Sequence, residues 1–240
     1  MRTGGPVRVV TAASLFDGHD AAIHIMRRIL QQQGAEVVHL GHDRSVDEIV
    51  DTAIQEDAHA IAVSSYQGGH VEFFRFMIDR LRERGAEHVR VYGGGGGTIL
   101  PEEIRALEAY GVARLFSPED GRALGLEGMI RAILDECAAA PRPALRVDRA
   151  AVAAGEPGAI ARAISWLEEQ GQSEAPSADL AAEREALGAL AAAGSVVVGF
   201  TGTGGAGKSS VVDELVRRLR TDAPDLRIGL LLVDPTRRRS

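Results

Sequence analysis

Residues 7–22, VRVVTAASLFDGHDAA, are the stretch from which the rest of the fold can be worked out. The run 7–13 is short and apolar, which is typical of a buried strand, and the pattern that begins at Asp20 is helical. Asp17 and His19 lie between them, on a loop at the carboxyl end of the strand, where open α/β sheets bind their ligands. An imidazole two residues from a carboxylate is typical of a metal ligand and the group that orients it.

The alternation of strand and helix continues beyond this stretch. We expect further strands at 36–40, 60–64, 88–92 and 113–116, and helices at 20–33, from Ser45, at 70–84, from Pro101 and at 121–138. Five such units predict an α/β, flavodoxin-like (βα)5 domain with a parallel sheet covered on both faces. A phospho-receiver has the same layout, but it needs an aspartate after the third strand and a lysine after the fifth. Ser64 and Ser117 occupy those positions.

Two more motifs fall at the carboxyl ends of expected strands. Ser64-Ser65-Tyr66 follows the third strand, and the five glycines 93–97 follow the fourth. Each glycine inside regular structure lowers the stability of the fold by about 0.5–1 kcal/mol relative to alanine, because it loses more backbone entropy on folding. A run of five therefore indicates that another group approaches the backbone closely.

In this order and spacing, the three motifs resemble the cobalamin-binding module of the adenosylcobalamin-dependent mutases. The segments SSYQGGH and GGGGGTILPEE are similar to sequences of the fused isobutyryl-CoA mutase branch in particular. Ala22 stands where the family has glycine, and Tyr66 where it usually has leucine. The resemblance covers about the first 137 residues, and three spaced motifs are more specific than one.

The resemblance implies a role for each motif. His19 would replace the cofactor's own base as the axial cobalt ligand, Asp17 would orient the imidazole, and the displaced nucleotide tail would be buried beside the serines and glycines. The residues that it places at the cofactor are Asp17, Gly18, His19, Asp20, Ala21, Ala22, Ser64, Ser65, Tyr66, Gly93, Gly94, Gly95, Gly96 and Gly97.

A second functional motif, GTGGAGKS at 202–209, is a complete Walker A sequence. It lies between an expected strand at 196–200 and an expected helix at 210–220. Backbone N–H groups of such a loop surround phosphates, Lys208 reaches the β and γ oxygens, and the Ser209 hydroxyl joins Mg²⁺. Lys208 is the single lysine among 27 basic residues. We expect nucleotide contacts from Gly204, Gly205, Ala206, Gly207, Lys208, Ser209 and Ser210.

A strand is also expected at 226–233, and Asp234 at its end is a candidate magnesium ligand. VDPTRRRS resembles a segment of the G-protein chaperones that serve cobalamin mutases, which implies GTP, although the residues present do not distinguish guanine from adenine.

The segment 195–240 is too short to bury a P-loop core. We therefore expect the N-terminal part of a longer polypeptide: a cobalamin domain at 1–138, a partly helical linker at 139–194 in which Trp166 packs, and a truncated P-loop domain.

Composition narrows the remaining possibilities. The net charge of −7 favours neither nucleic acid nor anionic membranes as partners. No apolar run approaches the ~20 residues of a membrane span. Cys137 is alone, so an internal disulfide is impossible, and these features together predict a cytoplasmic protein.

The resemblance implies an acyl-CoA mutase that converts isobutyryl-CoA to n-butyryl-CoA by a radical 1,2-rearrangement, with GTP-gated loading of adenosylcobalamin. It also implies a homodimer and an acyl-CoA-binding barrel outside these 240 residues, so this portion alone should lack mutase activity. Two alternatives remain open: a cobalamin carrier or sensor, and a P-loop NTPase joined to an unrelated flavodoxin-like domain.

Overall fold

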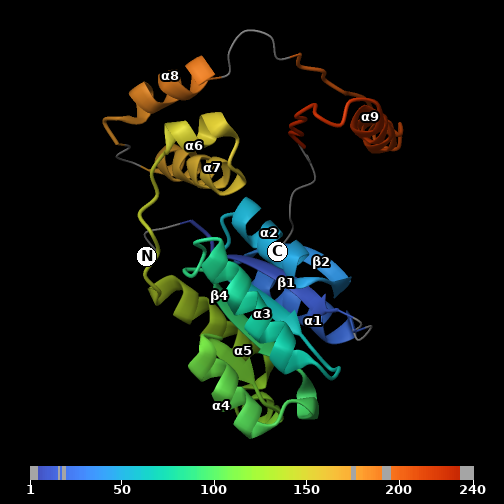
Figure 1. Cartoon of the computed structure of the whole chain (residues 1–240), viewed down its shortest axis with the longest axis vertical. Coiled ribbons are helices and arrows are strands. Elements are labelled where there is room, and N and C mark those ends of the chain that lie inside the picture. Colours follow the sequence, from blue (N-terminus) through green and yellow to red (C-terminus); the bar gives the residue numbers. More distant parts are fainter. Residues whose placement is uncertain (1–4, 16, 18–19, 174–176, 191–195, 233–240) are drawn as a thin grey trace. The chain divides into compact units, whose positions relative to one another are not determined.

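The structure is a computed structural model that describes residues 5–15, 17, 20–173, 177–190 and 196–232 (Figure 1). The chain divides into two compact units, Met1–Leu187 and Gly188–Ser240. Each unit is described separately. No helix in the described ranges is long and apolar enough to cross a membrane.

The first unit is built on a sheet of five parallel strands. These are β1 (Arg8–Ser14), β2 (Glu36–Arg44), β3 (Ala60–Ser64), β4 (Arg90–Gly94) and β5 (Arg114–Phe116). Their order is β2-β1-β3-β4-β5, with every neighbouring pair parallel. This is the doubly wound order of flavodoxin-like proteins, so the predicted fold class is confirmed.

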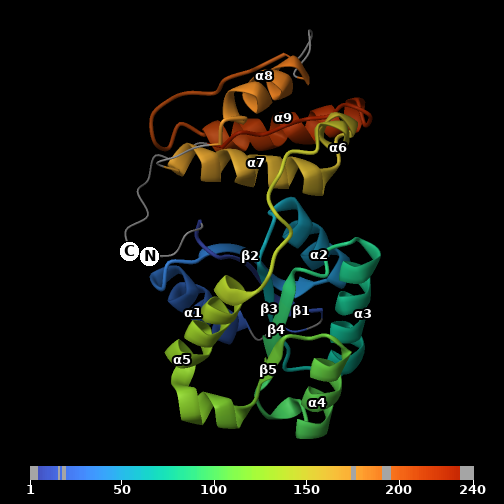
Figure 2. The same ribbon diagram turned by 90° about the vertical axis from the view of Figure 1, so that its left-hand side faces the viewer.

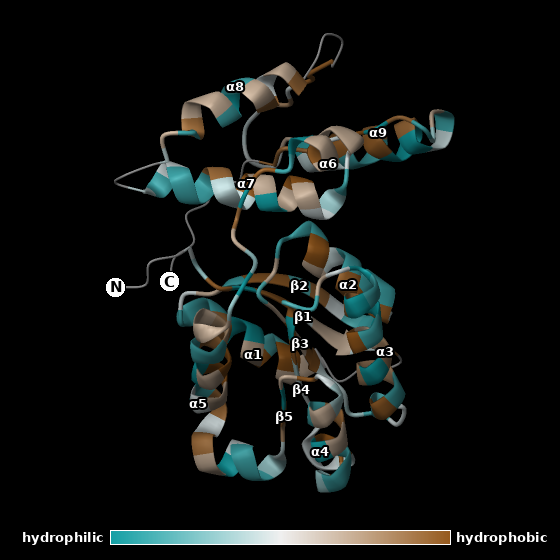
Figure 3. Cartoon of the chain, turned by 60° about the vertical axis from the view of Figure 1, so that its left-hand side comes forward, coloured by the Kyte–Doolittle hydropathy of each residue, from teal (hydrophilic) through white to brown (hydrophobic). Residues whose placement is uncertain are grey.

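Five helices cover the two faces of this sheet (Figure 2). They are α1 (Asp20–Gln32), α2 (Val46–Gln55), α3 (His70–Glu83), α4 (Pro101–Tyr110) and α5 (Pro118–Ala139). Residues of α1 and α5 share one hydrophobic cluster with the sheet, and residues of α2, α3 and α4 share the other. Hydrophobic and hydrophilic residues alternate along these helices (Figure 3), which is what burial of one face requires.

Local signals explain most element boundaries. The helix expected from Ser45 begins with a capping box that Ser45 and Glu48 form at the start of α2, and Pro101 opens α4 as expected. The expected start of α5 at residue 121 is three residues late, because Ser117 caps the helix through the backbone N–H of Asp120. Strand β4 was expected to end at residue 92 but runs two residues into the glycines, where it pairs with β5.

Between residue 139 and the P-loop, the described residues form three helices, in agreement with the partly helical character expected of this segment. They are α6 (Arg149–Ala154), α7 (Pro157–Gln172) and α8 (Leu180–Leu190). Helix α7 packs on α2. Trp166 on α7 is buried, in agreement with its expected packing role. The boundaries of the predicted linker itself stay a prediction.

Apart from the end of α8, the described part of the second unit contains one helix, α9 (Lys208–Asp222), which begins at the P-loop lysine. The prediction of strands at 196–200 and 226–233 is wrong for the residues that the structure describes, because none of them forms a strand. Val197 is 92% exposed and Leu231 is 91% exposed. A strand is stabilised by a hydrogen-bonded neighbour, and neither segment pairs with a strand in the described part of the chain.

Candidate functional site

The loop after β1 is tied to the loop after β3 by a buried carboxylate. Asp17 is 1% exposed, and its Oδ2 accepts a hydrogen bond from the backbone N–H of Tyr66 at 2.6 Å. The backbone N–H of Asp17 donates to the Ser14 carbonyl at 3.0 Å. Gly18 and His19 lie outside the described residues, as does the side chain of Asp20. The axial-ligand role of His19 therefore stays a prediction.

The two serines at the end of β3 have different surroundings. Ser65 is held on two sides, because its hydroxyl accepts from the Ser14 hydroxyl at 3.0 Å and its N–H donates to the Gly94 carbonyl at 2.8 Å. Ser64 is also buried, yet its Oγ has no hydrogen-bond partner in the parts of the chain that the structure describes. A buried hydroxyl without a partner is unfavourable, so Ser64 is a candidate ligand contact.

The glycine run is required largely by the protein's own packing. A Cβ at Gly95 would lie 1.7 Å from the Ser65 carbonyl oxygen, and one at Gly93 would lie 2.4 Å from the Phe74 ring. A Cβ at Gly97, in contrast, would have nothing within 4 Å. The resemblance implies that a nucleotide tail approaches this backbone. At positions 93 and 95 the approaching atoms belong to the protein itself.

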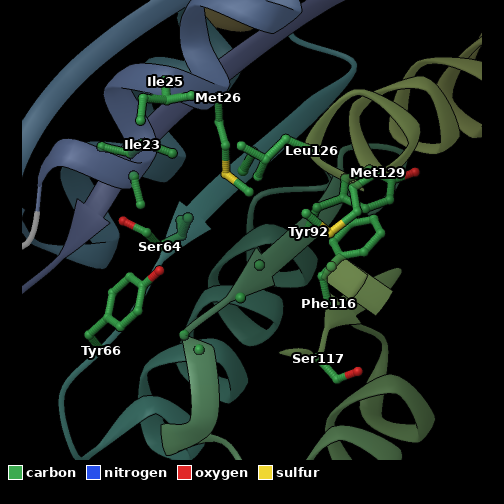
Figure 4. Close-up of a pocket in the computed structure, with 18 of the residues that line it drawn as sticks. Ile23, Ile25, Met26, Ser64, Tyr66, Tyr92, Phe116, Ser117, Leu126 and Met129 are labelled. Carbon is green, nitrogen blue, oxygen red and sulfur yellow. The ribbon is translucent and has the colours of Figure 1, made fainter. Parts of the chain in front are cut away.

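A cavity of about 270 Å³ opens beside these glycines (Figure 4). Its walls come from α1, the ends of β3 and β4, and α5, and no charged side chain of the described residues lines it. Among the predicted cofactor residues, the structure brings Ala22, Ser64, Tyr66 and Gly93–Gly96 to this cavity, whereas Asp17, Ala21, Ser65 and Gly97 do not line it.

Sequence reasoning missed the opposite wall of the cavity. Met26 on α1, Tyr92 on β4, Phe116 on β5 and Met129 on α5 all line it. No motif marks these residues. The one signal that could have found them is the sheet order, because α1 and α5 follow strands on either side of β3 and cover the same face.

The Tyr92 ring is anchored by polar groups outside the cavity. Its hydroxyl donates to Glu136 Oε2 at 3.0 Å and accepts from Arg90 Nε at 2.9 Å. Burial raises the pKa of Tyr92, so the phenol stays protonated and remains a donor. This network fixes one wall of the cavity in place.

In the second unit, the P-loop closes around its own lysine. Lys208 Nζ donates to the carbonyl oxygens of Gly202 at 2.8 Å and Thr203 at 2.7 Å. Gly205 and Gly207 have φ angles of 77° and 79°, the left-handed conformation that glycine adopts without strain. Ser209 and Ser210 lie in the first turn of α9. Asp234 lies outside the described residues, so its magnesium role stays a prediction.

Comparison with known proteins matches both parts of the chain to families. The B12 binding domain matches residues 7–122, and the methylmalonyl-CoA mutase-associated GTPase MeaB matches residues 160–240. One alternative left open by the sequence was a P-loop NTPase joined to a flavodoxin-like domain unrelated to cobalamin. The match to the B12 binding domain argues against that alternative.

Three relatives are similar to all or part of this chain. The fused isobutyryl-CoA mutases of Geobacillus kaustophilus and Nocardia farcinica are 57% and 59% identical over 98% of this chain. The chain spans about a fifth of their length, 22% and 21% respectively. The 2-hydroxyisobutanoyl-CoA mutase small subunit of Aquincola tertiaricarbonis is 37% identical over 42% of this chain and 72% of that subunit. The chain therefore belongs to the cobalamin-binding acyl-CoA mutase family, in the branch of the fused isobutyryl-CoA mutases.

Proposed function

We propose that this chain is the cofactor-holding and GTP-responsive portion of an acyl-CoA mutase that converts isobutyryl-CoA to n-butyryl-CoA. The observation that supports it best is the buried Ser64 hydroxyl, which has no partner among the described residues and lines an apolar cavity at the carboxyl edge of the sheet. A flat, mostly apolar base with a few polar atoms suits such a cavity.

Two parts of the first unit would hold adenosylcobalamin. The cavity would take the nucleotide tail, and His19, on the loop after β1, would be the axial cobalt ligand. Asp17 would orient that imidazole while its Oδ2 keeps the loop after β3 in place. When bound, adenosylcobalamin supplies a cobalt–carbon bond whose homolysis starts the rearrangement. The protein binds and orients the cofactor and excludes water from it.

The second unit would bind GTP and Mg²⁺ through residues 204–210, with Asp234 as a further magnesium ligand. In the structure, the Lys208 ammonium makes two hydrogen bonds to loop carbonyls, which a nucleotide's phosphates would replace. We propose that GTP binding and hydrolysis gate the loading of cobalamin. The family resemblance also leads us to propose a homodimeric whole protein in the cytoplasm, with the acyl-CoA bound by a barrel outside this chain.

A titration of the purified chain with adenosylcobalamin, followed by ultraviolet–visible absorption, tests the cofactor site. We expect the base-off, histidine-ligated spectrum in the wild-type chain and its loss in His19→Ala. His42→Ala is the matched control, because His42 lies on the exposed end of β2 and does not line the cavity. An unchanged cobalamin spectrum with the wild-type chain would refute the proposal.

A further inference from the structure

We propose that residues 118–126, the first part of α5, form a strap that opens to admit the nucleotide tail and then closes over it. This inference rests on the proposed function, because it takes the tail of a cobalamin as the ligand of the cavity. It adds to that function the part of the wall that moves and the residue at which it bends.

The cavity is small for a ligand that contains a base, a ribose and a phosphate. Its volume is about 270 Å³. Ligand sites in proteins usually have about 300–1,000 Å³ and enclose most of the ligand surface. A packed interior has little spare room beyond such a cavity. Binding of the tail therefore requires one wall of the cavity to move.

Most of the cavity wall is held by buried contacts. Strands β3 and β4 lie in the interior of the sheet, and the Tyr92 hydroxyl is bonded to Arg90 and Glu136. On α1, the side chain of Ile23 is 1% exposed. The second part of α5 supplies all the buried residues of that helix, which are Met129, Ile130, Ile133, Leu134 and Cys137.

The first part of α5 is held much less firmly. No side chain in the described stretch 118–124 is buried. Its start is fixed, because Ser117 caps the helix and Asp120 pairs with Arg114 at 3.1 Å. Segments with few buried contacts open locally at a lower free energy than the core does. Gly121 in this stretch lines the cavity, so the stretch is the wall that can move.

Gly125 separates the strap from the buried part of α5. Its φ of 63° and ψ of 172° form a combination that essentially only glycine adopts, and the helix bends there (Figure 2). A Cβ at Gly125 would meet nothing within 4 Å. The bend, and not close packing, therefore requires this glycine. Gly121 and Gly128 lie on either side of it, and each weakens the helix relative to alanine.

The strap carries two leucines that the ligand-free fold leaves partly in water. Leu124 and Leu126 are each 44% exposed. Leu126 lines the cavity, whereas Leu124 does not. A rotation at Gly125 that turned Leu124 onto the tail would remove apolar surface from water, which favours the closed strap once the tail is bound.

The test compares two cofactor forms on the purified chain. Adenosylcobalamin carries the nucleotide tail, and adenosylcobinamide has the corrin without it. Hydrogen exchange followed by mass spectrometry should show slower exchange of the amides in 118–126 when adenosylcobalamin binds, and no slowing with adenosylcobinamide. Residues 129–137, which carry the buried side chains of α5, should exchange at the same slow rate in every case.

Leu124→Ala tests the closure itself, because Leu124 does not line the cavity of the ligand-free chain. We expect its Kd for adenosylcobalamin to be about fivefold higher, the effect of uncovering about half of a leucine side chain. Its Kd for adenosylcobinamide should be unchanged. Ile164→Ala is the matched control: Ile164 on α7 is 53% exposed and does not line the cavity, so neither Kd should change.

Both expected results are required. Unchanged exchange in 118–126 with adenosylcobalamin, or a wild-type Kd in Leu124→Ala, would overturn the inference and leave the proposed function standing. An equal loss of affinity for both cofactor forms would also overturn it, because Leu124 would then act on the corrin or the fold and not on the tail. If the wild-type chain binds adenosylcobalamin no better than adenosylcobinamide, the cavity does not take the tail, and the proposed function is overturned together with this inference.

Discussion

Gly95 is the position where a single methyl group should most disturb the site. In Gly95→Ala the new Cβ would lie 1.7 Å from the Ser65 carbonyl oxygen, whereas ordinary contact begins at 3.4 Å. One of the two backbones must therefore move by about 1.7 Å, the difference between those distances. The Ser65 carbonyl cannot rotate away freely, because the Ser65 N–H bonds the Gly94 carbonyl at 2.8 Å and Thr98 Oγ1 donates to the Ser65 oxygen.

These contacts determine how much stability Gly95→Ala should lose. Overpacking of a dense interior costs about 1–3 kcal/mol, and a buried backbone group that loses its partner costs about 1–3 kcal/mol. We expect Gly95→Ala to lower the free energy of unfolding by about 2–6 kcal/mol, the sum of these two costs. Urea denaturation followed by far-ultraviolet circular dichroism measures this loss.

Gly97→Ala is the matched control, because it makes the same substitution two residues along the same run. A Cβ at Gly97 meets nothing within 4 Å, so we expect a change below about 0.5 kcal/mol. Equal destabilisation by the two variants would refute the reasoning, since it would mean that the run is needed for its flexibility and not for close packing at Gly95.

Four further predictions concern other parts of the chain. Ser64→Ala should raise the free energy of unfolding by about 1 kcal/mol, because it removes a buried hydroxyl that has no partner among the described residues, and should weaken adenosylcobalamin binding. Burial lowers the pKa of His59 from 6.5 to about 4, so stability should rise from pH 4 to 6.5 and level off above; His59→Gln should flatten that slope. Asp57→Ala leaves Arg142 without its carboxylate partner at 2.7 Å, so urea unfolding should show a loss of about 2–3 kcal/mol. In the full-length protein, Lys208→Met should abolish GTP binding in a fluorescent-nucleotide titration while the affinity for adenosylcobalamin stays unchanged.

The fold of the first unit could be predicted from the sequence because its signals are local. The apolar run 60–64 coincides with β3, and Ser45 with Glu48 marks the start of α2. Such signals depend on residues two to four positions apart, and they survive in the folded chain because the hydrophobic pattern of each element agrees with its propensity.

The cavity could be predicted only in part, because its two walls are far apart in the sequence. Ser64 and Gly93 follow strands, so their shared edge of the sheet was foreseeable. Met26 and Met129 are ordinary apolar helix residues, and they meet because the sheet order brings α1 and α5 to one face. The strand expected at 196–200 fails for a related reason. Its apolar pattern is correct, but pairing depends on a neighbouring strand, which a local pattern does not supply.

The site carries two features that do not favour the stability of the ligand-free chain. Ser64 keeps a buried hydroxyl without a partner in the described structure, and the glycines 93–97 lose more backbone entropy on folding than other residues would. Packing explains the glycines at 93 and 95, where neighbouring protein atoms exclude a Cβ. It does not explain Ser64, because alanine would fill the same space without an unpaired hydroxyl. A ligand that bonds this hydroxyl would remove the penalty, so the bound state should be more stable by an amount that grows with ligand concentration over Kd.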